Sequence, residues 1–326
     1  MLNTRITELF SIKYPIVQGA MQWLSRAELV SAVCNAGGLG IIASLTFPTV
    51  KELREEIRKT RDMTDKPFAV NITLLPTIRP VDHEQYIAAA IDEGVDIIET
   101  AGRSPEPYMK QLKDGGVRVM HKVARVADAQ KAERIGVDAV TIVGFEAAGH
   151  PGMDDVGGLA LIPLAVDSVK IPVIAGGGFG DGRGLVAALA LGAQGIAMGT
   201  RFMASQECPL HPRIKEQLLS ARETDTMLIE RSIKNAARVM KTDFSRRVLE
   251  MEERGATLEE MLPMLSGKLN RQALEEGDIN KGLIYCGQVI GLIHDIPSVK
   301  DIIEGMIGEA RLIGRRLSDM GLSTRL

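Results

Sequence analysis

The sequence has few aromatic residues, few cysteines and no excess of charge of one sign, and each shortage excludes a class of protein. Aromatic residues make up 4% of 326 residues, and the net charge of −3 comes without a basic block, so nucleic acid is not an expected partner. The three cysteines, Cys34, Cys208 and Cys286, form neither a disulfide framework nor a metal motif, because they are odd in number and widely spaced. They suit a reducing compartment.

Long apolar runs are also missing. No segment reaches the length that a membrane helix needs, so no membrane span is expected. The first residues, "MLNTRITELF", show neither the apolar stretch nor the cleavage site of a signal peptide. Hydrophobic residues make up 45% and charged residues 25%, which is typical of a globular protein with a large core. We therefore expect a cytoplasmic protein acting on a small molecule; the sequence does not set its oligomeric state.

The first two thirds of the chain alternate between short apolar runs and helical segments. The runs are continuously apolar, which indicates strands that are buried on both faces. Eight strand-plus-helix units favour a (β/α)8 TIM barrel over an open doubly wound sheet, because such a barrel closes at eight strands. The expected strands are residues 14–18, 38–44, 68–74, 95–101, 117–123, 137–144, 171–178 and 195–202.

The pattern changes after Phe202 to charged, amphipathic segments. We expect residues 1–202 to form the barrel, closed by C-terminal residues. Residues 203–326 are expected to form a mainly helical appendage or lid near the barrel mouth. The most apolar part of that region is "GLIYCGQVIGLI" (282–293), which should pack closest to the mouth.

Two glycine-rich loops follow the seventh and eighth expected strands, "AGGGFGDGRG" (175–184) and "MGTRF" (198–202). Barrels often bind phosphate at these loops. Glycine leaves the backbone N–H groups uncovered, so an anion can approach them closely. Ordinary tight turns are the alternative, but two such loops on these strands favour phosphate. The candidate residues are Gly176, Gly177, Gly178, Gly199 and Thr200.

Two further side chains carry candidate chemistry. Lys122 ends the fifth expected strand, where its ammonium group either extends to solvent or faces an anion such as a phosphate or a reduced flavin ring. His150 lies just beyond the sixth strand in "GFEAAGHPG" (144–152), a loop of small residues that something large can approach. A neutral imidazole there can act as a base or a hydrogen-bond donor. Nearby Glu146 either orients the ring or caps the loop.

The chain resembles the nitronate monooxygenase (2-nitropropane dioxygenase) family. The stretches that carry this resemblance are "NAGGLG", "HKV", "GFEAAGHPG", "GGGFGDGRG" and "ALGAQGIAMGTRF". The resemblance covers essentially the whole chain. It implies an FMN-dependent (β/α)8 barrel, in a family that includes bacterial NADH:quinone reductases and flavin-dependent enoyl-acyl-carrier-protein reductases.

The resemblance also implies roles for individual residues. His150 matches the proposed catalytic base or substrate-orienting residue, and the glycine-rich loops match the phosphate contacts. Ala20 stands where many members have glycine, a mild departure that leaves backbone contact possible. The implied flavin contacts are Ala20, Met21, Gln22, Thr73, Lys122 and Ala148, with phosphate contacts at Gly176, Gly177, Gly178, Gly199 and Thr200.

The family name implies oxidation of alkyl nitronates by molecular oxygen. NAD(P)H:quinone reduction on the same barrel is the alternative, with NAD(P)H as electron donor. The stretches "NITLLPTIRP" (71–80) and "GFEAAGHPG" (144–152) look especially like that branch. Enoyl-acyl-carrier-protein reduction is a more distant possibility.

Three readings outside the family remain weaker. A phosphosugar isomerase or aldolase would bind phosphate at the same glycine-rich loops, with Lys122 as a Schiff-base lysine. The related barrel that oxidises inosine monophosphate needs a nucleophilic cysteine after strand six, and "GFEAAGHPG" contains none. A non-catalytic scaffold is disfavoured because Lys122, His150 and both glycine-rich loops are expected on one face.

Overall fold

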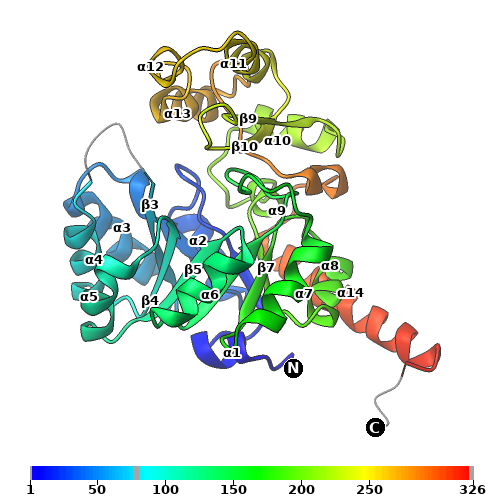
Figure 1. Cartoon of the computed structure of the whole chain (residues 1–326). Helices are drawn as coiled ribbons and strands as arrows, with labels where there is room; N and C mark the ends of the chain where they lie inside the picture. Colours follow the sequence, from blue (N-terminus) through cyan, green and yellow to red (C-terminus); the bar gives the residue numbers. More distant parts are fainter. Residues whose placement is uncertain (1, 76–80, 323–326) are drawn as a thin grey trace.

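A computed structural model describes residues 2–75 and 81–322 of the chain. Eight parallel strands form one sheet in the order β1-β8-β7-β6-β5-β4-β3-β2, which curls into a barrel (Figure 1). The predicted (β/α)8 TIM barrel is therefore confirmed. The strands are β1 (Ile16–Gln18), β2 (Ile41–Ala43), β3 (Ala69–Leu74), β4 (Ile97–Gly102), β5 (Arg118–Val123), β6 (Ala139–Val143), β7 (Val173–Gly176) and β8 (Gly195–Met198).

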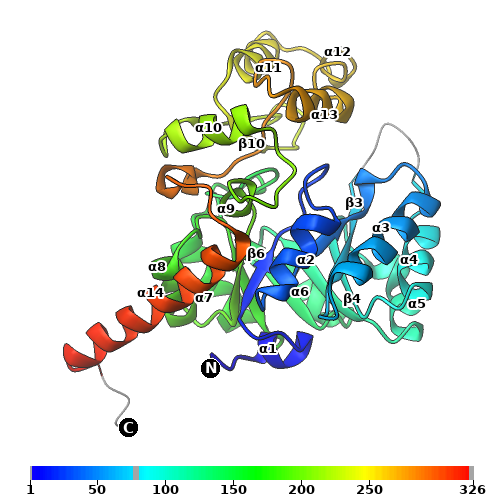
Figure 2. The ribbon, with the colours of Figure 1, turned by 180° about the vertical axis from the view of Figure 1, so that it is seen from behind.

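The barrel closes between β1 and the segment leading into β2. The Gln18 N–H donates to the Leu39 carbonyl at 2.8 Å, and the Leu39 N–H donates to the Ile16 carbonyl at 2.9 Å. Helices then cover the outside of the sheet (Figure 2). They are α2 (Ala27–Asn35), α3 (Val50–Met63), α4 (His83–Asp92), α5 (Met109–Asp114), α6 (Val126–Arg134), α7 (Gly158–Ser168) and α8 (Gly182–Ala190), with the 3-10 turns η1 (Ser44–Thr46) and η2 (Glu106–Tyr108).

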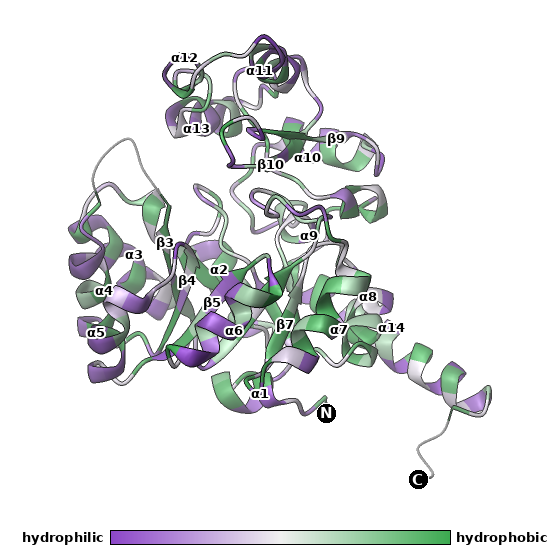
Figure 3. Cartoon of the chain, in the orientation of Figure 1, coloured by the Kyte–Doolittle hydropathy of each residue, from purple (hydrophilic) through white to green (hydrophobic). Residues whose placement is uncertain are grey.

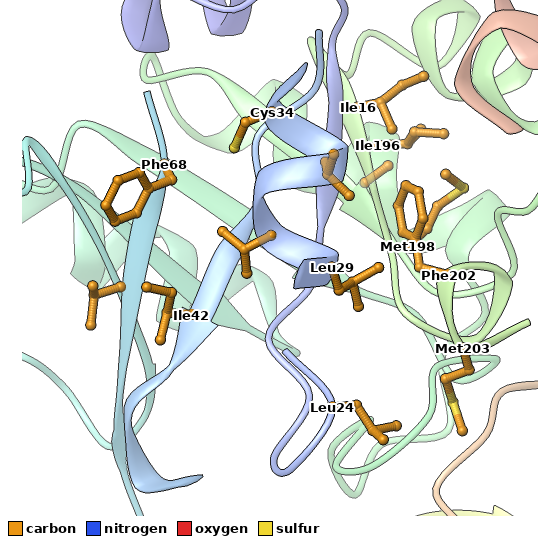
Figure 4. Close-up of a cluster of buried hydrophobic side chains, with 14 of the residues drawn as sticks. Ile16, Leu24, Leu29, Cys34, Ile42, Phe68, Ile196, Met198, Phe202 and Met203 are labelled. Carbon is orange, nitrogen blue, oxygen red and sulfur yellow. The ribbon is translucent and has the colours of Figure 1, made fainter. Parts of the chain in front are cut away.

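Two apolar layers form the core, because successive residues of a strand face opposite sides of the sheet. Val17, Ala69 and Met120 belong to the cluster inside the barrel, whose lower end is filled by Ile6 and Phe10 of α1 (Arg5–Phe10). The second cluster lies between strands and helices (Figure 4), where its labelled members include Ile16, Leu29, Cys34, Ile42 and Phe202. Colouring by hydropathy shows the apolar strands surrounded by helices, of which α4, α5 and α6 carry many polar residues whereas α7 is more apolar (Figure 3).

The eighth strand is shorter than predicted. The sequence pattern extended it to Phe202, but β8 ends at Met198 and residues Thr200–Met203 form the short helix α9. The Gly199 carbonyl accepts hydrogen bonds from the N–H groups of Phe202 and Met203, at 2.9 and 3.1 Å. This turn redirects the chain at the barrel mouth and buries Phe202 in the outer core instead of in the sheet.

Residues 203–298, which we call the cap, stand over the carboxyl ends of the barrel strands in both views (Figures 1 and 2). The cap contains a short antiparallel hairpin that the amphipathic pattern did not predict. It has its own apolar cluster, which includes Ile229, Val239 and Phe244. Its elements are α10 (Pro212–Ser220), β9 (Thr226–Ile229), β10 (Ala237–Met240), α11 (Asp243–Glu253), α12 (Leu258–Met261), α13 (Gly267–Glu276) and η3 (Gln288–Leu292).

The chain then returns to the barrel wall through α14 (Val299–Asp319), so the region expected as one appendage divides into the cap and a wall helix. α14 packs against α8 and α2 with a buried face that includes Ile303 and Ile307. Its Glu309 carboxylate accepts a hydrogen bond from the Gly182 N–H at 2.7 Å. Within the described residues, no helix combines the length and apolar composition needed to cross a bilayer.

The contact between α8 and α14 predicts a stability difference between two glycine substitutions. A Cβ on Gly182 would lie 2.6 Å from the Met306 carbonyl oxygen and 2.8 Å from the Ala310 nitrogen, whereas a Cβ on Gly308 meets nothing within 4 Å. We expect Gly182→Ala to lower the free energy of unfolding by about 1–3 kcal/mol, because backbone must shift. Gly308→Ala should be neutral or stabilising by up to about 1 kcal/mol. Urea unfolding measures both, and equal midpoints would contradict this packing.

Candidate active site

The inside of the barrel becomes polar toward the mouth. At alternate positions of β3, β4, β5 and β6, the inner apolar layer is followed by Asn71, Glu99, Lys122 and Thr141. The Thr73 hydroxyl donates to the side-chain oxygen Oδ1 of Asn71 at 2.7 Å, and the Asn71 side-chain NH2 donates to the Glu99 carboxylate at 2.6 Å. The predicted residues Thr73 and Lys122 are therefore part of one polar lining at the mouth.

Two groups in this lining, the Glu99 carboxylate and the Thr141 hydroxyl, fit contact with a bound polar molecule. Burial raises the pKa of Glu99, and this rise is opposed by the positive charge of Lys122 and the hydrogen bond from Asn71. Thr141 lies beside Lys122 in the strand register. Its buried hydroxyl has no hydrogen-bond partner among the described residues. A buried hydroxyl is usually satisfied, so this one fits the polar edge of a ligand that also meets the Lys122 ammonium.

The loops after β7 and β8 expose unused backbone donors. Within residues 2–75 and 81–322, no protein acceptor is hydrogen-bonded to the N–H groups of Gly177, Gly178, Gly199 and Thr200. Gly177 and Gly178 have φ values of +87° and +84°, which other residues rarely adopt. A Cβ on Gly177 would also lie 3.0 Å from the Ala147 nitrogen. Several free N–H groups on adjacent loops form a fitting site for a phosphate.

The remaining members of the predicted phosphate set are more enclosed. Gly176 is buried at the end of β7, where a Cβ would lie 2.8 Å from Val143 Cγ1. The Thr200 hydroxyl accepts a hydrogen bond from the Gly287 N–H at 3.0 Å, so it already links the β8 loop to the cap. Its hydroxyl hydrogen is still available to donate to an anion.

The loop after β1 lies against the loop after β8. A Cβ on Gly199 would be 3.4 Å from Met21 Sδ. The Met21 N–H donates to Ser25 Oγ at 2.8 Å, and the Gln22 amide donates to the Leu45 carbonyl at 3.2 Å. These bonds hold the partly exposed segment Ala20–Gln22 at the mouth, beside the unused N–H groups.

Glu146 caps a helix and does not orient His150. Both of its carboxylate oxygens accept a hydrogen bond from the Gly158 N–H, at 3.0 Å, at the first residue of α7. The Gln288 N–H donates to the Glu146 carbonyl at 3.0 Å, and a Cβ on Gly287 would lie 3.2 Å from the Ala148 nitrogen. The β6 loop, including the predicted residue Ala148, is therefore packed against the cap.

A paired bridge fixes the histidine loop to the cap hairpin. The Gly149 N–H donates to the Arg238 carbonyl at 3.1 Å, and the Arg238 N–H donates back to the Gly149 carbonyl at 2.6 Å. The buried Arg238 guanidinium donates to the Phe145 carbonyl at 2.9 and 3.2 Å and lies 4.5 Å from the Phe145 ring centroid. The cap thereby determines where His150 lies.

Two cap side chains contact the His150 ring. Asn235 Nδ2 is 3.1 Å from His150 Nε2. The Tyr285 ring stacks near the imidazole, with centroids 6.5 Å apart and an angle of 29° between the planes. Asn235 is in turn hydrogen-bonded to the Glu230 carboxylate.

The imidazole is neutral at pH 7. The surrounding protein and, to a smaller extent, the positive charge of Lys122 lower the pKa of His150 to about 4. More than a third of the residue is nevertheless exposed, so water reaches part of the ring and reduces the desolvation. Both causes lower the pKa of His150 below its ordinary value of 6.5, so the ring is predominantly neutral at pH 7.

Sequence analysis missed the side chains that surround the predicted residues. Glu99 had a local signal, since a carboxylate inside the apolar run 95–101 is unusual. Asn235, Glu230 and Tyr285 had none, because Asn235 meets His150 across 85 positions of sequence. Only the fold of the cap brings them to the loop after β6.

Comparison with known proteins covers nearly the whole chain. Residues 3–309 match the family described as nitronate monooxygenase. The chain is 35% identical to the (3aS,4S,5R,7aS)-5-hydroxy-7a-methyl-1-oxo-octahydro-1H-indene-4-carboxyl-CoA dehydrogenase of Rhodococcus jostii, over 95% of this chain and 96% of the relative. It is 30% identical to a probable nitronate monooxygenase of Staphylococcus saprophyticus, over 97% and 99% of the two chains.

Among solved structures, FabK from Thermotoga maritima superposes with a TM-score of 0.92 at 39% identity. That alignment covers 98% of this chain and 100% of FabK, so it includes the cap as well as the barrel. The similarity therefore extends to both parts that meet at His150.

The lowered pKa of His150 predicts how the ring titrates. We expect its proton to bind below pH 6.5, because the surrounding protein disfavours the charged ring and Lys122 repels a second positive charge. NMR titration of the imidazole C–H resonances from pH 4 to 8 measures this, with His150→Gln identifying the signal. A midpoint at or above 6.5 would contradict the described surroundings.

Proposed function

Because the chain belongs to the nitronate monooxygenase family, whose members are flavin-dependent oxidoreductases, we propose that it uses FMN and NAD(P)H to reduce the double bond of an enoyl thioester. The observation that carries this proposal is the 39% identity to the enoyl reductase FabK over 98% of the chain. The CoA dehydrogenase relative, at 35% identity, is also named for a substrate that is a thioester.

The residues at the mouth fit an FMN molecule. Its phosphate would take the N–H groups of Gly177, Gly178, Gly199 and Thr200, which have no protein acceptor among the described residues. Its ring would meet the polar lining that includes Lys122, whose charge favours a reduced, anionic flavin. Bound flavin would relay hydride equivalents between NAD(P)H and the substrate, which no protein side chain can do.

The reaction adds a hydride to the β-carbon of the enoyl group and a proton from solvent to the α-carbon, while NAD(P)H is oxidised to NAD(P)+. Negative charge develops on the thioester carbonyl oxygen as the hydride arrives. In our proposal the neutral His150 imidazole donates a hydrogen bond to that oxygen, and such donors act most strongly where charge develops. The cap hairpin holds His150 in place for this role through the Gly149–Arg238 bridge.

Nitronate oxidation by molecular oxygen is the second candidate. The match of residues 3–309 to the family and the 30% identity to a probable nitronate monooxygenase support it. His150 would then orient the nitronate or act as a base. Quinone reduction by NAD(P)H shares the same flavin site and is included in the experiment below.

Anaerobic mixing separates these functions. We expect the FMN-loaded protein to be bleached by NADH or NADPH and recoloured by crotonyl-CoA, a short enoyl thioester, faster than by a quinone. Recolouring by a quinone alone would favour quinone reduction. Bleaching by propyl nitronate, followed by recolouring in air and without any response to NAD(P)H, would contradict the proposal in favour of nitronate oxidation.

The variant His150→Ala tests the assigned donor. It should retain FMN and be bleached by NAD(P)H, but turn over crotonyl-CoA roughly 100-fold more slowly, since loss of one such donor typically lowers kcat by this order. Unchanged turnover would contradict the role given to His150.

A further inference from the structure

A turn in the cap presents Asn235 to His150. The turn joins β9 to β10, and it contains two non-glycine residues with positive φ, Glu230 at +63° and Lys234 at +58°. The Glu252 carboxylate accepts hydrogen bonds from the N–H groups of Glu230 and Ser232, at 2.6 and 2.8 Å. The Asn235 N–H donates to the Glu230 carbonyl at 3.0 Å. Strained residues held this firmly are common where a side chain must be placed accurately.

The hydrogen bonds in this turn fix the orientation of the Asn235 amide. Its nitrogen, Nδ2, is the atom that bonds to the Glu230 carboxylate. Burial raises the pKa of Glu230, and the hydrogen bond from Asn235 opposes this rise by favouring the ionised form. The ionised carboxylate can only accept, so the amide NH2 and not the amide carbonyl faces it. Glu230 is only 4% exposed and has no cation within ion-pairing distance in the described part of the chain. The Asn235 amide is therefore its principal donor.

The same amide nitrogen then dictates the protonation of the histidine. With one hydrogen directed to Glu230, the second hydrogen of Nδ2 is directed to His150 Nε2, 3.1 Å away. Nε2 must accept this bond through its lone pair. A neutral imidazole carries one hydrogen, which is consequently on Nδ1. Within residues 2–75 and 81–322, no group is hydrogen-bonded to Nδ1, so this N–H is available to a bound molecule.

We propose that Glu230 and Asn235 are positioning residues that hold His150 as the Nδ1–H tautomer, so that its ring meets the substrate as a hydrogen-bond donor and not as a base. The tautomer follows from the contacts alone. The identity of the acceptor, a thioester carbonyl oxygen, rests on the proposed function. Lys122 from β5 is the charge that acts on His150, while Glu230 lies behind Asn235 and feels the negative charge of Glu252.

The tautomer can be read directly in the wild-type protein. In protein labelled with 15N-histidine, long-range proton–nitrogen NMR distinguishes a protonated from an unprotonated ring nitrogen. We expect the His150 signals at pH 7 to show Nδ1 protonated and Nε2 unprotonated. His150→Gln identifies the His150 signals among the five histidines. A protonated Nε2 in the wild-type protein would overturn the proposal.

A double substitution reverses the constraint. In Asn235→Asp/Glu230→Gln the total charge of the pair is unchanged, but the carboxylate now at position 235 can only accept. His150 Nε2 should therefore become protonated, leaving the Nδ1 lone pair toward the substrate. The matched control is Asn280→Asp, because the Asn280 side-chain oxygen accepts from the Asp243 N–H at 3.2 Å, a bond that aspartate keeps. The control adds negative charge to the cap without touching His150.

Kinetics separate positioning from a merely structural role. The double variant should be bleached by NAD(P)H at the wild-type rate, while its kcat for crotonyl-CoA falls roughly 100-fold, as for loss of the donor itself. Asn280→Asp should match the wild type in both steps. Undiminished crotonyl-CoA turnover with the tautomer reversed would overturn the proposal. A wild-type protein that shows the expected tautomer but never turns over enoyl thioesters would instead refute the proposed function and leave the tautomer assignment standing.

Discussion

The candidate site depends on backbone N–H groups at the ends of β7 and β8 that have no acceptor in the described part of the chain. Gly177, Gly178 and Gly199 are partly exposed, so an arriving anion can replace water at these N–H groups. Gly177 and Gly178 adopt positive φ values, and Gly177 approaches the backbone of the β6 loop too closely for a side chain. In the proposed arrangement, an anion bound here would place the rest of its molecule across the mouth, toward Lys122 and the loop of His150.

Barrel and cap have different tasks in this arrangement. The barrel provides the N–H groups, the Lys122 charge and the unpartnered Thr141 hydroxyl, which suit a cofactor. The cap provides Asn235 and Tyr285 around His150, and its buried Arg238 fastens the two parts at the Phe145 carbonyl. One loop, after β6, therefore touches both the proposed flavin site and the proposed substrate site. Because the cap contributes to the proposed substrate site, a sequence similarity that includes the cap is more informative about the substrate than a similarity confined to the barrel.

Sequence alone predicted the barrel, because buried parallel strands are continuously apolar and the eight repeats follow one another locally. It also predicted Lys122, His150 and the glycine-rich loops as neighbours, since all follow barrel strands. It extended the eighth strand too far, because Thr200 and Phe202 are residue types common in strands and only the turn at Gly199 ends the strand. It left Glu146 undecided between two roles, and the contact with Gly158 resolves them. The cap hairpin and Asn235 were not predictable, because their short strands carry no distinct pattern and their contacts depend on distant segments.

The central claim is that the bare loop after β7 binds the flavin phosphate, and a pair of alanine substitutions tests it most directly. Gly178→Ala has room for its Cβ, 3.5 Å from the Glu146 Cβ, but strains the backbone at φ +84°. Gly116→Ala introduces the same strain at φ +69°, with nothing within 4 Å, outside the loops at the mouth. Fluorescence titration of the apoprotein with FMN measures the Kd of each variant. We predict that Gly178→Ala raises the Kd roughly tenfold, which is equivalent to about 1.4 kcal/mol of strain from the left-handed backbone. Gly116→Ala should leave the Kd unchanged. Equal Kd values for both variants and the wild type would contradict the account.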